Sequence, residues 1–133
     1  MTVGLLIVTH HTVGEALLSA ATGMLGLCPL KVEVVAVPNQ ADPDEKAAEA
    51  ERCRQRLDDG DGVLILTDMY GSTPSNISAR LLRNGPCAMV AGINLPMLIR
   101  VLNYPALPLE ELAEKALSGG RDGILLARPE PYG

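Results

Sequence analysis

The chain has 133 residues, 47% of them apolar, and a formal net charge of −5 at neutral pH. This length fits one domain with a buried core, and the negative charge argues against nucleic-acid binding, which needs clustered lysine and arginine. No apolar run approaches the roughly 20 residues that span a bilayer, and the start of the chain has no signal-peptide pattern. We therefore expect a cytoplasmic protein without direct membrane insertion.

The first half of the chain alternates apolar runs with helical patterns. The apolar run 3–8 predicts a buried strand, and residues 13–26 place apolar side chains at helical spacing. The β-branched run 32–37 predicts a second strand. Asp42 as N-cap, followed by Pro43, predicts a helix over 42–58.

The second half continues this alternation, with Thr73 and Asn94 as predicted N-caps and Gly119 and Gly120 as the predicted stop of the last helix. The predicted strands are 62–67, 87–92 and an edge strand over 123–128, and the predicted helices are 74–83, 95–103 and 109–120. Strands that alternate with helices form a parallel sheet with helices on both faces. We therefore predict one doubly wound α/β domain over residues 1–133.

The cysteines and the glycines give no sign of a bound cofactor. Cys28, Cys53 and Cys87 lie far apart, and no cysteine–histidine pair has zinc-site spacing. The chain also lacks the glycine-rich motifs that bind nucleotide phosphates. We expect no metal and no cofactor.

Polar residues gather where two predicted strands end. In open parallel sheets, ligands bind beyond the carboxyl ends of the strands, where the winding direction reverses. With the common strand order 2-1-3-4, the ends of the first and third strands flank this crevice. Thr9 and His10 end the first strand, and Asp68 follows the third. The order therefore predicts that His10 and Asp68 meet.

This pairing predicts phosphoryl transfer. A carboxylate that accepts the proton of one imidazole nitrogen leaves the other nitrogen free as a nucleophile. The loop at Gly71, Ser72 and Thr73 leads into a helix, whose N-terminus attracts anions. Each feature alone has an ordinary explanation as a cap or a turn, so the phosphohistidine hypothesis depends on their convergence at one crevice.

Three motifs carry a family resemblance: THxxxGEALL after the first strand, LxDxYGSTPSN after the third, and GxNLPMLIRVL after the fourth. With their order and spacing, the chain resembles the enzyme IIA domain of the mannose–fructose–sorbose phosphotransferase system. The resemblance implies a flavodoxin-like homodimer in which the last strand, 123–128, pairs antiparallel with the sheet of the partner. It also implies that phosphohistidine HPr donates to His10, and that His10 passes the phosphoryl group to an enzyme IIB, expected here on a separate chain.

The resemblance also assigns the surrounding residues. Asp68 would orient His10, while Thr73 and the backbone of Gly71 and Ser72 would receive the phosphoryl group, and we count Thr9 with them. His11 stands where the family commonly has glycine, and it is either a rim residue or a helper that adds positive charge. Asn94, after the fourth strand, is a second possible auxiliary residue.

Two other functions are compatible with parts of the sequence. The protein could be a regulatory phosphoprotein whose His10 phosphorylation is recognised by partner proteins without any transport. A receiver domain phosphorylated on Asp68 is disfavoured, because receivers need an acidic pair after the first strand, where this chain has His10 and His11.

Overall fold

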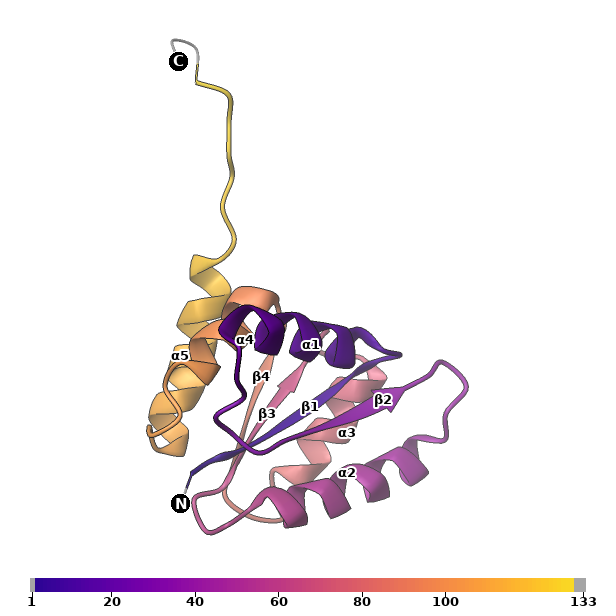
Figure 1. Ribbon diagram of the computed structural model, residues 1–133. Helices are drawn as coiled ribbons and strands as arrows, with labels where there is room; N and C mark the ends of the chain where they lie inside the picture. The colour runs from indigo at the N-terminus through magenta and orange to yellow at the C-terminus, as the bar shows by residue number, and fades with distance from the viewer. Residues whose placement is uncertain (1, 131–133) are drawn as a thin grey trace.

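Four parallel strands form the centre of the computed structural model, which describes residues 2–130 (Figure 1). They lie in the order β2-β1-β3-β4, which confirms the predicted order. Their bounds are β1 Gly4–His10, β2 Val32–Val37, β3 Val63–Thr67 and β4 Cys87–Ala91. From β1 the chain winds toward β2, and from β3 it winds toward β4. The direction therefore reverses between β1 and β3.

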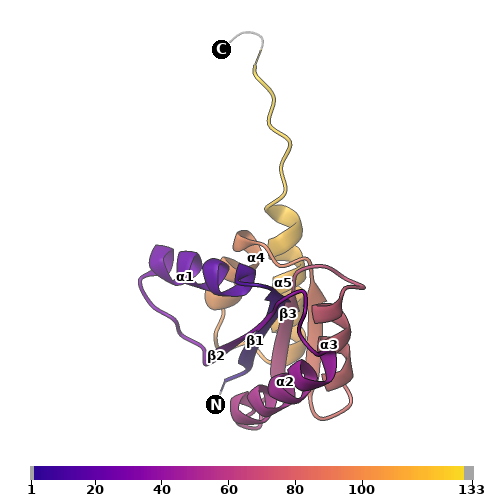
Figure 2. The same ribbon diagram turned by 90° about the vertical axis from the view of Figure 1, so that its right-hand side faces the viewer.

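Helices cover both faces of the sheet, as predicted (Figures 1 and 2). On one face lie α1 (Val13–Leu25), α4 (Leu95–Leu102) and α5 (Leu109–Asp122). On the other lie α2 (Pro43–Leu57) and α3 (Thr73–Leu81). No helix in residues 2–130 has the length and apolarity that crossing a membrane would require.

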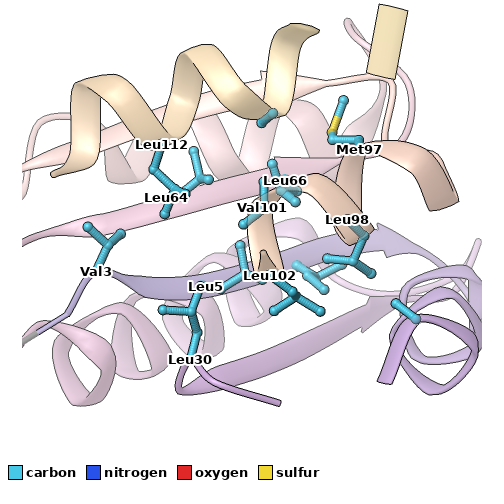
Figure 3. Packing of buried hydrophobic residues seen from close by; sticks show 13 residues of the cluster. Val3, Leu5, Leu30, Leu64, Leu66, Met97, Leu98, Val101, Leu102 and Leu112 are labelled. Atoms are coloured by element: carbon cyan, nitrogen blue, oxygen red, sulfur yellow. The ribbon is translucent and has the colours of Figure 1, made fainter. Parts of the chain in front are cut away.

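Side-chain alternation along the strands supplies two separate cores. On β1, Leu5 and Ile7 join the cluster under α1, α4 and α5, which Figure 3 shows, whereas Leu6 and Val8 join the cluster under α2 and α3. All four side chains are fully buried. Because the chain has no Phe and no Trp, branched aliphatic side chains fill both layers.

The helix starts agree with the predicted caps at two of three places. Asp42 Oδ1 accepts the N–H of Asp44 at 2.9 Å, and Asn94 Oδ1 accepts the N–H of Met97 at 2.9 Å. The third prediction was wrong by one residue, since α3 begins at Thr73 with Ser72 as its N-cap.

The predicted stop of the last helix was also wrong. α5 continues through Gly119 and Gly120 to Asp122. A Cβ at either glycine would lie 2.7–2.8 Å from side-chain atoms of Arg100 or Met97 on α4. The glycines therefore allow close packing of two helices, and that packing outweighs their low helix propensity.

The segment after α5 is not a strand within this chain. Residues 123–130 carry no regular structure and extend away from the sheet (Figure 1). Ile124, Leu125 and Leu126 are 75–85% exposed. A strand here needs an edge to pair with, so the exchanged edge strand stays a prediction about a second copy.

Candidate active site

His10 and Asp68 meet at the carboxyl end of the sheet. His10 is the last residue of β1, and Asp68 directly follows β3, the strand beside it. The His10 ring nitrogen Nδ1 lies 2.9 Å from Asp68 Oδ2, and the backbone N–H of His10 donates to the same oxygen at 3.0 Å. Two hydrogen bonds therefore fix the imidazole against the carboxylate.

These contacts favour an ionised Asp68 and one tautomer of the neutral His10 ring. Burial alone would raise the pKa of Asp68, but the hydrogen bonds from the backbone and ring of His10 outweigh it and hold that pKa below its ordinary value. An ionised carboxylate can only accept, so Nδ1 carries the proton. In the neutral imidazole the free lone pair then lies on Nε2, and the His10 side chain is 36% exposed.

His10 lines a small pocket at the carboxyl end of the sheet. Its volume is about 160 Å³, and its wall includes Pro38 and Asn39 after β2 and Thr73 and Pro74 at the start of α3. No lysine or arginine lines it. An anion in this pocket would therefore depend on N–H groups, hydroxyls and the positive end of the α3 dipole.

The sequence reasoning missed Pro38 and Asn39. The predicted strand order contained the signal, because β2 lies beside β1 and its carboxyl end reaches the same edge of the sheet as His10.

The loop after Asp68 uses most of its own donors. The N–H of Gly71 donates to Ser75 Oγ at 3.2 Å, and the N–H of Ser72 donates to the Met69 carbonyl at 3.2 Å. Gly71 adopts a φ of +86°, which suits glycine. Thr73 alone of the three predicted loop residues lines the pocket. Phosphoryl binding by Gly71 and Ser72 would thus require their N–H groups to change partners.

Thr9 and Asn94 hold neighbouring elements in place. Thr9 is fully buried on the face opposite His10, and its Oγ1 accepts the N–H of Gly14 at 2.8 Å, which ties the start of α1 to β1. Asn94 caps α4, and its side-chain amide donates to the Gly120 carbonyl at 3.1 Å. A direct phosphoryl contact from either remains a prediction.

His11 turns the chain out of β1. It has a φ of +46°, the only positive φ at a non-glycine residue among those the structure describes. Its backbone N–H donates to the Val37 carbonyl at 3.1 Å, and the residue is exposed. The backbone thus explains why glycine fits this position.

Comparison with known proteins identifies a family. The family model described as "PTS system fructose IIA component" matches residues 4–117. The mannose-specific EIIAB component of Escherichia coli K12 is 29% identical over 136 residues, covering 98% of this chain and 41% of that protein. This chain therefore spans less than half the length of that relative.

Two solved structures share the fold. The mannose/sorbose specific IIA subunit from Enterococcus faecalis has a TM-score of 0.87 at 21% identity, with 100% of both chains covered. The EIIA component from Streptococcus agalactiae has a TM-score of 0.79 at 21% identity, covering 92% of this chain and 95% of that one. With the match over residues 4–117, the chain belongs to the mannose-type enzyme IIA family of the phosphotransferase system.

Proposed function

We propose that this protein carries a phosphoryl group on Nε2 of His10, accepting it from phosphohistidine HPr and passing it to an enzyme IIB. The observation that supports this most directly is the 2.9 Å contact between His10 Nδ1 and Asp68. With Nδ1 donating to Asp68, a neutral imidazole has its lone pair on Nε2, and His10 lines a small pocket beside the N-terminus of α3.

The reaction needs one bond to form and one to break. The Nε2 lone pair attacks the phosphorus of the donor, while the phosphorus–nitrogen bond of the donor breaks and its electron pair returns to the donor imidazole. The His10 ring gains positive charge as the new bond forms. The carboxylate of Asp68, hydrogen-bonded to Nδ1, stabilises that charge. Attack by a nucleophile of enzyme IIB later releases the group.

A second copy would complete the fold at its open edge. Within residues 2–130, β4 has no neighbouring strand on its outer side, and a groove of about 270 Å³ runs between it and α5. Its wall includes the apolar Met89, Ala113 and Leu117, together with Glu110 and Glu114. The exposed segment Ile124–Leu126 is the apolar strand that such an edge would accept. We infer a homodimer in which each copy lends residues 123–128 to the β4 edge of the other.

The test is phosphorylation in a reconstituted system. The native protein, His10→Ala and His11→Ala are each incubated with phosphoenolpyruvate, enzyme I and HPr. The native and His11→Ala forms should take up label, and His10→Ala should not. The label should be lost in acid and kept in base, as phosphohistidine is.

Two results would overturn the proposal. One is label kept by His10→Ala but lost by His11→Ala. The other is a base-labile phosphate, which would indicate Asp68 instead. Addition of enzyme IIB separates transport from regulation, because a carrier loses its label to IIB, whereas a purely regulatory phosphoprotein keeps it.

A further inference from the structure

The two residues after Asp68 expose large apolar side chains at the candidate active site. Met69 is 64% exposed and Tyr70 is 79% exposed. Aromatic residues are scarce in this protein, which has three Tyr, no Phe and no Trp. Tyrosine and methionine are both enriched in protein–protein interfaces. The pair is therefore a candidate contact for another protein.

Hydrogen bonds hold these two side chains on a defined turn, residues 69–72. The Met69 carbonyl accepts the N–H of Ser72 at 3.2 Å and the hydroxyl of Ser72 at 2.5 Å. The N–H of Gly71 donates to Ser75 Oγ at 3.2 Å. Side chains on a pre-organised turn lose less conformational entropy on binding than side chains of a mobile loop. The turn thus presents Met69 and Tyr70 in a form suited to docking.

Asp68 joins this turn to His10. Its Oδ1 accepts the N–H of Met69 at 3.0 Å, while its Oδ2 accepts the backbone N–H of His10 and contacts the ring. Consecutive Cα atoms lie about 3.8 Å apart, so the Cα of Tyr70 is at most about 7.6 Å from that of Asp68. A protein bound to Tyr70 would therefore have a defined position relative to the His10 ring.

A protein that donates a phosphoryl group to His10 must cover the surface around it. Direct transfer brings the donor phosphorus next to Nε2, and a standard interface buries about 800 Å² on each partner, a disc about 16 Å in radius. The turn lies within that area, as does Val13, 42% exposed at the start of α1. Segments 10–14 and 69–74 contain no Lys, Arg, Asp or Glu. This surface fits a donor with apolar side chains around its phosphohistidine.

We propose that the turn 69–72, with Tyr70 as its main contact, is the docking site for phospho-HPr, an inference that rests on the proposed function. Tyr70 and Met69 pack against apolar side chains beside the phosphohistidine of the donor. Asp68 then relates the docked donor to the nucleophile. No bond forms or breaks at the turn, so its contribution is to the affinity for the donor and not to the chemical step.

The test separates affinity from rate. Transfer from phospho-HPr is followed by rapid-quench kinetics over a range of donor concentrations. Tyr70→Ala should raise the half-saturating donor concentration about thirtyfold, the effect of losing a central interface residue, while the limiting rate changes far less. Binding alone is measured with His10→Ala, which cannot accept the group. In that background Tyr70→Ala should weaken binding of phospho-HPr by the same factor.

Matched variants control for the loss of exposed apolar surface in general. Tyr70→Phe keeps the ring and should retain the native affinity for phospho-HPr. Met69→Ser should weaken binding, whereas Met24→Ser should not, although the two methionines are 64% and 67% exposed. Met24 lies toward the end of α1 that is away from His10, about 16 Å along the helix from Val13 at 1.5 Å per residue.

Four results would overturn the inference. Tyr70→Ala could keep the native donor affinity, or it could lower the limiting rate alone, which would place Tyr70 in the chemical step. Met24→Ser could weaken binding as much as Met69→Ser. Weaker self-association of Tyr70→Ala in sedimentation equilibrium would indicate that a second copy covers the turn. Each of these results leaves phosphorylation of His10 intact. A native protein that accepts no phosphoryl group would instead overturn the proposed function, and this inference with it.

Discussion

The carboxyl end of the sheet and the β4 edge differ in where their contacts come from. One chain supplies the contacts at the carboxyl end, whereas the β4 edge is proposed to pair with a second copy. At the carboxyl end, residues 58 positions apart hydrogen-bond directly, with both donors of His10 directed to one oxygen of Asp68. At the β4 edge, no strand from residues 2–130 pairs with the outer side, and the exposed apolar segment 124–126 extends into solvent.

The other edge of the sheet sharpens this contrast. β2 is also an edge strand, but Glu33 on it pairs with Arg56 of α2, a charged arrangement that discourages further strand pairing. β4 consists of Cys87–Ala91 and contains no charged residue. The two edges thus differ in their own charge, and the β4 edge lies beside a groove whose wall combines apolar side chains with Glu110 and Glu114 of α5.

Removal of the segment after Gly123 should have the largest effect. Burial of three aliphatic side chains contributes about 4 kcal/mol or more, so a chain ending at Gly123 should dimerise about a thousandfold more weakly. Sedimentation equilibrium measures this. Phosphorylation of His10 should persist in the shortened chain, because its hydrogen bonds lie within one chain.

An exposed apolar residue outside the tail provides the matched control. Met24 on α1 is 67% exposed, comparable with Ile124. Met24→Ser should leave the dimer unchanged while Ile124→Ser weakens it. Equal weakening by the two substitutions would contradict strand exchange through the tail.

Asp68→Asn should have the next largest effect, this time at the carboxyl end. An amide can donate as well as accept, so it no longer fixes the proton on Nδ1, and the rate of phosphoryl transfer should fall about a hundredfold. Rapid-quench kinetics with phospho-HPr measure the rate, and circular dichroism should show an unchanged fold. A native rate in Asp68→Asn would refute the tautomer argument.

The same substitution tests the lowered pKa of Asp68. A carboxyl whose pKa is lower in the folded state adds stability above its unfolded pKa of about 3.9, and that stability is lost as pH falls through the folded pKa. The unfolding free energy of the native protein should therefore fall as pH drops below about 4. In Asp68→Asn this fall should be smaller.

The sequence could predict contacts that follow from the order of the strands, but not contacts that depend on the conformation of loops. Strand order and the rule for parallel sheets place His10 beside Asp68, and that contact is present at 2.9 Å. The wall formed by Pro38 and Asn39, and the bond from Gly71 to Ser75, depend on how loops close. No periodicity in the sequence encodes that closure.

Packing between separate helices was the other feature that could not be predicted from the sequence. Glycine has a low helix propensity, which favoured a stop at Gly119, but contact with Arg100 keeps the helix intact there. The predicted strand over 123–128 likewise depends on packing that the sequence does not reveal, in this case on pairing with a second copy. Its sequence favours a strand, but residues 123–130 carry no regular structure in this chain. A strand there needs an edge to pair with.

Gly14→Ala should have a smaller effect, again at the carboxyl end. A Cβ there would lie 2.7 Å from a methyl carbon of Ile7 and 3.0 Å from Thr9 Oγ1. The crowding should destabilise the protein by about 1–3 kcal/mol, measured by urea denaturation. Gly23, which has nothing within 4 Å of its Cβ position, is the matched control on α1, and Gly23→Ala should not destabilise the protein. An equal loss in Gly23→Ala would contradict the crowding argument, because helix propensity alone favours alanine over glycine.

His11→Gly should have the smallest effect, and it separates the two histidines. At a φ of +46° a side chain strains the backbone, so glycine should stabilise the fold by about 0.5–1 kcal/mol in urea denaturation. If His11 is only a rim residue, the transfer rate from phospho-HPr should stay native. A slower rate with a more stable fold would instead show that its imidazole assists His10, since strain retained at a functional site must be offset by a gain in function. Asn at the same position tolerates this φ without carrying charge, so the rate of His11→Asn distinguishes loss of the imidazole from added flexibility of the backbone.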